Sequence, residues 1–371
     1  MTRSPARPVV AFVIEALTVG GAEQMLVAMA NRFASRGWTV HLICLTTAGE
    51  LAPRLDDRVH FEVIGKRPGF DWRLALRLRR RLTAIDPVAI NSHLWTANLW
   101  TRVALPFSRH RIVVTEHSRD TWKPRHYRVI DRVLARWTHR LVAVSHDTRD
   151  FYVNEIGIPA ALTTVINNGI DTAQFAGGTA TAFRAEWAPN GELLIGTVGR
   201  LVPAKNHARL IEATALLDVT IDDFKVLIVG DGPLRSEIEN AVQAHGVAHR
   251  VHLLGARRDI ADVLSALDIF VLSSDREGHP LTALEAQAAG TPVVLTDAGG
   301  SQDAIASDGT DTGGLLVERS AAALAECIAS LARDTAEREQ MAAVAKRVAS
   351  TAFDLDAMVA RYESCFSTAA G

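Results

Sequence analysis

Short apolar runs rich in β-branched residues alternate with longer amphipathic stretches along nearly all of the 371 residues. This alternation is typical of parallel strands joined by helices, because a parallel neighbour needs a long crossover connection. The strand-like runs are residues 9–14, 39–45, 59–64, 88–92, 112–116, 141–145, 164–167, 193–198, 225–229, 251–254, 269–273, 292–296 and 315–317. The sequence therefore predicts an α/β fold built from two doubly wound, Rossmann-like domains.

Residues 167–192 separate the two predicted domains. This stretch contains no strand-like run and is rich in Gly, Ala, Thr and Asn, as expected of a boundary. Two domains also fit the length, because ~100–200 residues form one domain. We predict an N-terminal domain over residues 1–175 and a C-terminal domain over residues 176–352, which face each other across a cleft.

Charge is distributed unevenly, although the formal net charge is only −2. Residues 1–150 hold 24 Lys and Arg against 13 Asp and Glu, whereas the remainder holds 16 against 29. The cations gather in residues 66–81 and 119–140. The aromatic residues among them are Phe70, Trp72, Trp122, Tyr127 and Trp137. Two interpretations stay open: a surface that meets an anionic partner, either lipid headgroups or nucleic acid, or solvated helix faces whose aromatic side chains point inward.

Neither a membrane span nor a secretion signal is predicted near the amino end. The longest apolar run there, residues 9–14, is far short of the ~20 residues that cross a bilayer, and no cleavage site follows it. Cys44, Cys327 and Cys365 are too few for a disulfide framework and too far apart for a metal site. We therefore expect a cytoplasmic protein.

Glycine-containing motifs follow three of the predicted strands. Gly20 and Gly21 come after the first strand, residues 199–200 end the strand at 193–198, and residues 230–233 end the next one. Ligands of open parallel sheets bind beyond the carboxyl ends of the strands. The fingerprint Gly-x-Gly-x-x-Gly is absent, which weighs against a nicotinamide-dependent dehydrogenase.

Arg200 and Lys205 stand five residues apart in a predicted turn between a strand and a helix, just after Gly199. A guanidinium fork and an ammonium group in such a turn can bind a diphosphate and neutralise a leaving group that gains charge. A strand exit with two solvated cations is the alternative interpretation.

The strongest motif runs from Ser273 to Glu285, from an apolar strand through a polar loop into a helix that starts near Pro280. Amide groups at a helix start can hold a phosphate without a charged side chain. Glu285, about one turn inside the helix, is placed to accept hydrogen bonds from a ribose diol, and Glu277 is placed near a sugar beyond the diphosphate. Ordinary helix-start electrostatics is the alternative for both carboxylates.

The ordered set of motifs resembles the retaining glycosyltransferases of family four, also called glycosyl transferases group 1. Their hallmark is a Glu, seven residues and a second Glu, which Glu277 and Glu285 match. The other matching segments are residues 20–23, 168–171, 199–205, 230–233 and 285–300. The resemblance implies the GT-B fold of two Rossmann-like lobes, with a C-terminal helix over residues 353–371 that packs back on the N-terminal domain.

The resemblance also implies roles for individual residues. Arg200 and Lys205 match the pair that binds the donor diphosphate, Glu285 the ribose ligand, and Glu277 the carboxylate that contacts the donor sugar. His117 matches a histidine that faces the reacting sugar, although His93 also ends a strand. We therefore expect Glu277, His117, Arg200 and Lys205 to be catalytic. The other donor-site residues that the resemblance implies are Gly20, Gly21, Gly199, Gly255, Arg257, Gly278, His279, Pro280, Leu281 and Thr282.

Members of this family transfer a sugar with retention and without a metal, so the resemblance implies no cofactor besides the donor. The Asp-x-Asp motif at residues 354–356 lies away from every predicted strand end. The cations Arg200 and Lys205, with the helix-start amides, would then replace a divalent ion. The acceptor hydroxyl would attack the face from which the phosphate departs, and that phosphate would take the proton.

The resulting prediction is a hexosyltransferase that uses a UDP- or GDP-linked sugar and a saccharide or lipid-linked saccharide acceptor in cell-surface polysaccharide or glycoconjugate synthesis. The basic N-terminal domain would hold the acceptor and dock on the anionic inner face of the cytoplasmic membrane, and nucleic acid is not an expected partner. A nucleotide-sugar epimerase of the same fold and a non-catalytic nucleotide-sugar binding protein are the alternatives.

Overall fold

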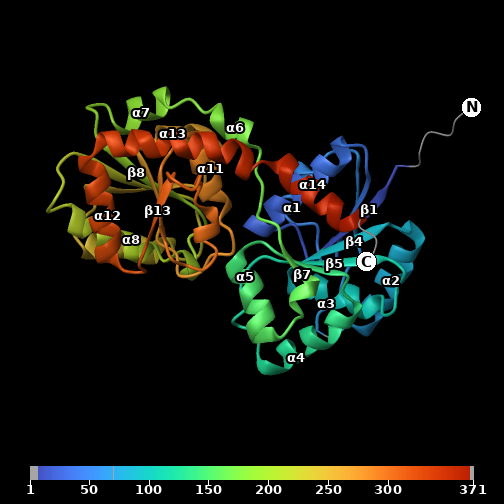
Figure 1. The fold of residues 1–371 in the computed structure, drawn as a ribbon. Coiled ribbons are helices and arrows are strands. Elements are labelled where there is room, and N and C mark those ends of the chain that lie inside the picture. The colour runs from blue at the N-terminus through green and yellow to red at the C-terminus, as the bar shows by residue number, and fades with distance from the viewer. Residues whose placement is uncertain (1–6, 70, 368–371) are drawn as a thin grey trace, which may run out of the picture. The chain divides into compact units, whose positions relative to one another are not determined.

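The computed structural model describes residues 7–69 and 71–367, which form two compact units (Figure 1). The first unit comprises Met1–Gly169 and Leu355–Gly371, and the second comprises Ile170–Asp354. The sequence places the boundary at 175/176, inside helix α6 (Thr172–Ala176). The structure assigns the whole of α6 to the second unit, because this helix packs on α10, α11 and α13 of that unit.

Seven parallel strands form the sheet of the first unit, in the order β3-β2-β1-β4-β5-β6-β7. They are β1 (Val9–Ile14), β2 (Thr39–Cys44), β3 (Val59–Val63), β4 (Ala89–His93), β5 (Arg111–Glu116), β6 (Arg140–Ala143) and β7 (Thr163–Val165). The helices of this unit are α1 (Gly21–Ser35), α2 (Trp72–Ile85), α3 (Leu94–Ala104), α4 (Arg125–Leu134), α5 (His146–Asp150) and α14 (Leu355–Ser367).

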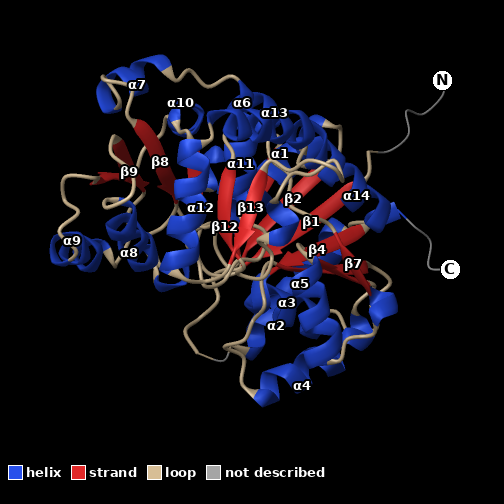
Figure 2. Ribbon diagram, turned by 60° about the vertical axis from the view of Figure 1, so that its left-hand side comes forward, coloured by secondary structure: helices blue, strands red, loops and turns tan. Residues whose placement is uncertain are grey.

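Helices cover both faces of this sheet (Figure 2). On one face, Ala11 and Val13 of β1 join a core with Leu74 and Leu78 of α2 and with side chains of α3. On the other face, the ring of Phe12 packs against rings from α1 and α14. Because successive side chains of a strand point to opposite faces, a strand buried on both sides needs an unbroken apolar run, and residues 10–14 of β1 are completely buried.

Six parallel strands form the sheet of the second unit, in the order β10-β9-β8-β11-β12-β13. They are β8 (Leu193–Val198), β9 (Phe224–Val229), β10 (Val251–Gly255), β11 (Ile269–Leu272), β12 (Val293–Thr296) and β13 (Gly314–Val317). The remaining helices are α7 (Thr181–Trp187), α8 (His207–Leu217), α9 (Arg235–Ala244), α10 (Ile260–Ala266), α11 (Leu281–Ala289), α12 (Ala321–Arg333) and α13 (Thr335–Ala352). Two separate apolar clusters lie on the two faces of this sheet.

The predicted fold class is confirmed: each unit is a doubly wound α/β sandwich, and all thirteen expected strands are present. In both sheets the order of the strands reverses beside the first strand, β1 or β8. In open parallel sheets, ligands bind in the crevice at such a point, outside the carboxyl ends of the strands. The facing of the two units across a cleft stays a prediction from the sequence.

Helix α14 belongs to the first unit and packs on α1. Asp356 pairs with Arg32 and Arg36, and Glu363 pairs with Arg36 and accepts a hydrogen bond from the indole of Trp38. The second carboxylate of the Asp-x-Asp motif therefore holds this helix in place. Residues 368–371 of the expected C-terminal helix lie outside the described residues. None of the described helices is both long and apolar enough to cross a bilayer.

Candidate active site

The two cations expected to bind a diphosphate lie in the turn between β8 and α8, at the carboxyl end of the first strand of the second unit. Lys205 ends the short 3-10 helix η5 (Pro203–Lys205), and Arg200 is exposed just after β8. The stem of Lys205 passes over Gly199, where a Cβ atom would stand 3.6 Å from Cε of Lys205. Lys205 is half-buried, whereas the side chain of Arg200 is exposed and open to a ligand.

Lys205 and Glu277, predicted from separate motifs, meet in the structure. Lys205 Nζ lies 2.7 Å from Glu277 Oε1, and the same oxygen accepts a hydrogen bond of 2.6 Å from Ser274. The side chains are only 21% and 9% exposed, so solvent screens this pair weakly. An ammonium group has three donors, and within residues 7–69 and 71–367 the Lys205 ammonium donates to Glu277 alone.

The loop after β11 is fixed to the turn that carries Lys205. The amide of Asp275 donates to the carbonyl of Ala204 at 2.8 Å, and Asn206 donates to the Asp275 carboxylate at 3.0 Å. Arg209 donates to the carbonyl of Ser273 at 2.7 Å and to Asp275 at 2.6 Å. The sequence alone assigns no role to Asn206, Arg209 and Ser274, because their contacts depend on which strand ends meet.

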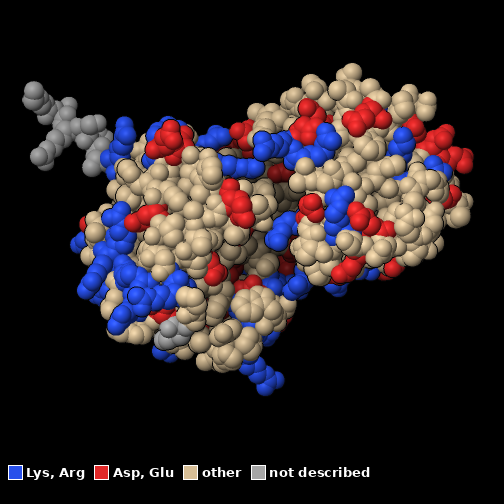
Figure 3. Space-filling model, turned by 180° about the vertical axis from the view of Figure 1, so that it is seen from behind, with Lys and Arg blue, Asp and Glu red and all other residues tan. Residues whose placement is uncertain are grey.

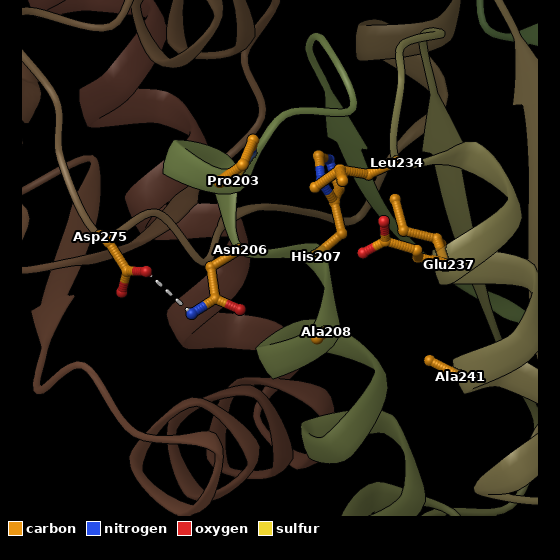
Figure 4. Close-up of a pocket in the computed structure, with 9 residues that line it drawn as sticks. Pro203, Asn206, His207, Ala208, Leu234, Glu237, Ala241 and Asp275 are labelled. Atoms are coloured by element: carbon orange, nitrogen blue, oxygen red, sulfur yellow. Dashed lines mark hydrogen bonds between the residues drawn. The ribbon is translucent and has the colours of Figure 1, made fainter.

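A hollow of about 330 Å³ is lined in part by Pro203 and Asn206 of this turn, which Figure 4 draws as sticks. Its walls come from the start of α8 and from α9, and the hydrogen bond between Asn206 and Asp275 lies on one side. None of the predicted site residues lines this hollow. It is therefore a different place from the ion pair of Lys205 and Glu277.

Two glycines let neighbouring strand ends approach closely. A Cβ atom on Gly230, whose φ is +137°, would strike the carbonyl oxygen of Gly199, and one on Gly232 would lie 2.5 Å from the carbonyl oxygen of Leu201. The amide of Leu201 donates to the backbone carbonyl of Asp231 across the same contact at 3.0 Å. The backbone around Arg200 therefore has its shape only because these two residues lack side chains.

Helix α11 begins directly after the Glu277 loop, with Pro280 as its N-cap and no side chain capping the first amides. The amide groups of Leu281 and Thr282 belong to the first turn, which has no preceding helical carbonyl to bind. Gly278 and His279 just before it are buried. The His279 ring lies against Phe353, and its Nε2 lies 3.1 Å from the carbonyl oxygen of Asp303.

Glu285 lies one turn inside α11 and is half-buried. Nothing in the described part of the chain donates a hydrogen bond to its carboxylate. Burial raises the pKa of Glu285 to about 7. An acid that is partly protonated near neutral pH and lacks a protein partner gains most from a ligand that supplies hydroxyl donors.

The loop after β10 carries Gly255 and Arg257. Gly255 adopts a φ of +72°, and its carbonyl accepts a hydrogen bond from the amide of Gly230 at 2.8 Å. The guanidinium of Arg257 lies over the ring of Phe183 and donates to both oxygens of Asp259 at 2.9 and 2.6 Å. The Arg257 side chain is therefore occupied by Phe183 and Asp259 of its own unit. Backbone groups are what this loop can offer to a ligand.

In the first unit, the residues predicted from the amino-terminal motif surround the start of α1. Gly20 is the N-cap in an extended conformation, and Gly21 begins the helix. A Cβ atom on Gly20 would strike the carboxylate of Glu23, which accepts a hydrogen bond from Thr18 at 3.2 Å. A side chain at position 20 would therefore require the Glu23 carboxylate to move.

His117 follows the end of β5 and is half-buried. Its Nε2 lies 3.0 Å from Nδ1 of His93, the completely buried last residue of β4. Burial lowers the pKa of His117 to about 4 and keeps the pKa of His93 well below its usual value, so both rings are neutral near pH 7. Both histidines stand at the ends of predicted strands, but the sequence does not predict that they contact each other.

The two basic stretches match neither interpretation completely. Trp72 and Trp122 are 58% and 56% exposed, whereas Tyr127 packs on Trp95 with ring centroids 4.4 Å apart. Lys123 is a correction to the idea of a cationic surface, because it is completely buried between Asp120 and Asp131 at 2.8 and 2.9 Å. Trp137 is half-buried, and Phe70 lies outside the described residues.

Two family profiles match this chain, one over each half. A profile described as "Glycosyl transferases group 1" matches residues 179–348, and one described as "Glycosyltransferase Family 4" matches residues 19–174. The chain belongs to the family 4 (group 1) glycosyltransferases. Each profile corresponds to most of one structural unit.

Relatives of this glycosyltransferase differ in their named donors. It is 32% identical over 181 residues to the UDP-Gal:alpha-D-GlcNAc-diphosphoundecaprenol alpha-1,3-galactosyltransferase of Escherichia coli, an alignment that covers 47% of each chain. It is 32% identical over 177 residues to the GDP-mannose-dependent alpha-mannosyltransferase of Mycobacterium tuberculosis, covering 47% and 43% of the two chains. These alignments span about half the length of the relatives. The D-inositol 3-phosphate glycosyltransferase of Kineococcus radiotolerans is 28% identical, with coverage of 88% and 86%.

Solved structures share the fold of this glycosyltransferase over nearly its whole length. HepE of Anabaena in complex with UDP has a TM-score of 0.84 at 22% identity, covering 96% of this chain and 99% of HepE. A glycosyltransferase from Rickettsia africae has a TM-score of 0.85 at 18% identity, covering 97% and 98%. The predicted GT-B fold is thereby confirmed.

Proposed function

We propose that the protein is a retaining hexosyltransferase that moves a sugar from a UDP- or GDP-linked donor to a saccharide acceptor without a metal cofactor. The observation that carries this proposal is the ion pair of Lys205 and Glu277 at 2.7 Å, whose lysine lies in the same turn as the exposed Arg200. Arg200, Lys205 and Glu277 thus bring two cations and a carboxylate to strand ends within the region that the family profile matches. Relatives named for UDP-Gal and for GDP-mannose support both donor classes.

In the proposed reaction the bond between the anomeric carbon and the diphosphate oxygen breaks, and the nucleoside diphosphate leaves with the electron pair. Arg200, Lys205 and the first amides of α11 stabilise the charge that grows on it. The acceptor hydroxyl forms the new bond on the face that the diphosphate leaves, and its proton passes to the departing phosphate. This step retains the configuration and needs no nucleophile from the protein.

Other residues orient the donor in this proposal. Glu285 accepts hydrogen bonds from the ribose hydroxyls, and backbone groups near Gly255 contact the base. Glu277 contacts the donor sugar and, through its ion pair, fixes the Lys205 ammonium where the diphosphate binds. His117 faces the transferred sugar. Among the described residues, no three His, Cys, Asp or Glu side chains converge as a metal site.

The donor is tested by thermal stabilisation with UDP, GDP and ADP, followed by nucleoside diphosphate release from the matching donor sugars. We expect UDP or GDP to raise the unfolding temperature and activity to persist in EDTA. Activity that chelation abolishes and magnesium restores would overturn the metal-independent mechanism. Binding without release from any donor would indicate a nucleotide-sugar binding protein, and conversion of the donor sugar to its isomer would indicate an epimerase.

The cationic groups are tested by substitution. Lys205→Ala should lower turnover by about 10²–10³-fold and weaken nucleoside diphosphate binding, because both depend on the ammonium group. Glu277→Gln should lower turnover by about 10²-fold, with a smaller loss of nucleotide affinity than in Lys205→Ala. Lys346→Ala removes an exposed lysine of α13 and is the matched control. Full turnover in Lys205→Ala would refute the diphosphate contact.

For the acceptor, we propose a lipid-linked saccharide at an anionic membrane surface, bound by the first unit. Figure 3 shows Lys and Arg side chains gathered over α2. Exposed Arg73, Arg79 and Arg80 surround Trp72 and the 48% exposed Leu76 of this helix. Apolar side chains within a ring of cations suit the boundary between headgroups and acyl chains. The E. coli relative is named for a diphosphoundecaprenol-linked acceptor, which supports this proposal.

Liposome sedimentation tests the membrane surface. We expect binding to vesicles with anionic lipid, weak binding to neutral vesicles, and loss of binding in the double variant Arg73→Glu with Arg80→Glu. Arg333→Glu, at an exposed position of α12 in the second unit, should bind as the parent does. Equal binding to both vesicle types, or none, would refute the proposal without affecting the donor site.

A further inference from the structure

Two histidine rings face each other, and one hydrogen lies in the contact between them. The β4 and β5 strands run in parallel register with His93 beside Thr115, and His117 follows within the same edge of the sheet. Nδ1 of His93 and Nε2 of His117 stand 3.0 Å apart. One of these two nitrogens must donate and the other accept, so the pair has two possible arrangements of its hydrogens.

A backbone carbonyl determines the orientation of the neighbouring amide. The Nδ2 atom of Asn91 lies 3.1 Å from the carbonyl oxygen of Val113 and 2.9 Å from Oγ1 of Thr115. A carbonyl oxygen only accepts, so the amide nitrogen of Asn91 must face Val113 and its oxygen must face the other way. That oxygen lies 2.9 Å from Nε2 of His93. Because the Asn91 oxygen can only accept, Nε2 of His93 carries a hydrogen.

The position of the hydrogen on His93 in turn determines the position of the hydrogen on His117. His93 is completely buried and neutral, so a ring with a hydrogen on Nε2 has a bare Nδ1. The bare Nδ1 accepts, and Nε2 of His117 must donate to it. A neutral His117 with a hydrogen on Nε2 has a lone pair on its Nδ1, on the side of the ring away from His93. No hydrogen bond to this Nδ1 is formed within the described residues.

We propose that Asn91 and His93 are positioning residues that hold His117 in the Nε2–H tautomer, so that its Nδ1 accepts a hydrogen bond from a hydroxyl group of the substrate. The assignment rests on the proposed function for the identity of that substrate. A fixed tautomer makes the position beside His117 selective for groups that can donate a hydrogen bond. A sugar hydroxyl can donate to the lone pair, whereas a fully ionised phosphate oxygen has no proton to donate and is repelled.

The tautomer is read directly by long-range ¹H–¹⁵N correlation spectra of the full chain labelled in histidine, with no donor present. The chain has 13 histidines, and the spectrum of His117→Asn assigns the signals of His117. We expect a protonated Nε2 and an unprotonated Nδ1 on His117. A protonated Nδ1, or an even mixture of tautomers, would overturn the proposal whether or not the protein is a transferase.

Two substitutions of His93 test the positioning role. An Asn side chain can place its oxygen where Nδ1 of histidine stood, whereas Leu offers no acceptor. His93→Leu should give His117 a mixture of tautomers and lower kcat/KM for the donor about five- to tenfold, as expected for one lost hydrogen bond. His93→Asn should restore the Nε2–H tautomer and stay within about threefold of the parent.

The control is His110→Asn, which replaces a buried histidine just before β5, at the other end of this strand from His117. It should leave the tautomer and turnover unchanged. Circular dichroism melts identify variants that do not fold, and the parent spectrum alone still decides the tautomer. An unchanged tautomer in His93→Leu would show that His93 does not set it. A missing donor activity with the expected tautomer would count against the proposed function and not against the histidine pair.

Discussion

At the scale of single residues, burial without a partner marks the positions that await a ligand. Glu285 and Glu277 both lie at the carboxyl side of the second sheet, but only Glu277 has a cation, Lys205 at 2.7 Å. Glu285 instead has a pKa raised to about 7. A ribose hydroxyl would give this carboxylate the hydrogen bonds that the protein does not.

The raised pKa of Glu285 predicts a pH-dependent stability. An unfolded glutamate titrates near 4.3, so the contribution of Glu285 to folding is complete below that pH and is lost as the pH rises through about 7. Glu285→Gln should therefore lessen the fall in the free energy of unfolding between about pH 5 and pH 8, gaining on the order of 1–3 kcal/mol at pH 8. Urea unfolding at both pH values measures this difference.

Glu116 also has a pKa raised to about 7, and because it is present in both proteins the comparison isolates Glu285. Glu212→Gln, at an exposed position of α8, is the control and should leave the pH dependence as it is. Parallel pH profiles for the parent and Glu285→Gln would show that Glu285 is ionised in the folded protein at neutral pH.

At the scale of elements, the site depends on how closely three strand ends approach one another. The ends of β8, β9 and β10 are joined by hydrogen bonds from Leu201 to Asp231 and from Gly230 to Gly255. These contacts require glycine at positions 230 and 232, because a side chain there would strike a neighbouring carbonyl. Loops fixed in this way can hold Arg200 and Lys205 ready for a ligand.

Gly230→Ala tests this dependence on close approach. The new Cβ would strike the carbonyl of Gly199 at a φ of +137°, so we expect a loss of ~2–4 kcal/mol in stability and weak nucleotide binding. Gly246→Ala has a φ of +70° but open space, and it should lower stability by only ~1 kcal/mol. Thermal melts and nucleotide titrations compare the two. Equal effects would mean that backbone strain, and not the contact, is what Gly230 relieves.

The sequence predicts the elements well and their contacts poorly. Strands such as Val9–Ile14 are found because a strand buried on both faces must be apolar throughout. The meeting of His93 with His117, and of Arg209 with Asp275, depends on which strands become neighbours, and no single motif carries that information. The resemblance to a family placed Lys205 and Glu277 in one site, but their ion pair becomes visible only in the structure.

The same limit explains the error at Lys123. A basic stretch with aromatic residues suggests a surface, yet Asp120 and Asp131 lie within the same stretch and draw Lys123 inward. A buried cation between two carboxylates cannot be separated from an exposed one by composition alone.

At the scale of the whole molecule, the two units have the same strand order around β1 and β8, but only the first is completed by a segment from the chain end. Helix α14 contributes Phe366, which is 2% exposed and packs against Phe12, Phe33 and Trp38. The stability of the first unit therefore depends on residues that follow the second unit in sequence.

Phe366→Ala should thus lower the stability of the first unit selectively. Loss of a buried phenylalanine removes about 3–5 kcal/mol, so the calorimetric transition of the first unit should move to lower temperature while that of the second stays. Arg361→Ala, at an exposed position of α14, is the control and should change stability by no more than about 0.5 kcal/mol. A shift of both transitions together would show that the units unfold as one.

The chain enters the second unit at Ile170 and leaves it at Asp354, and these two places touch. The amide of Ile170 donates to the carbonyl of Phe353 at 2.8 Å, and Ile170 pairs with Asp354 in a parallel bridge. The second unit is therefore an insertion into the sequence of the first unit, and the two ends of the insertion lie in contact. A gene fragment that encodes residues 170–354 begins and finishes at one spot, so the half that carries Lys205, Glu277 and Glu285 is suited to separate expression and ligand screening.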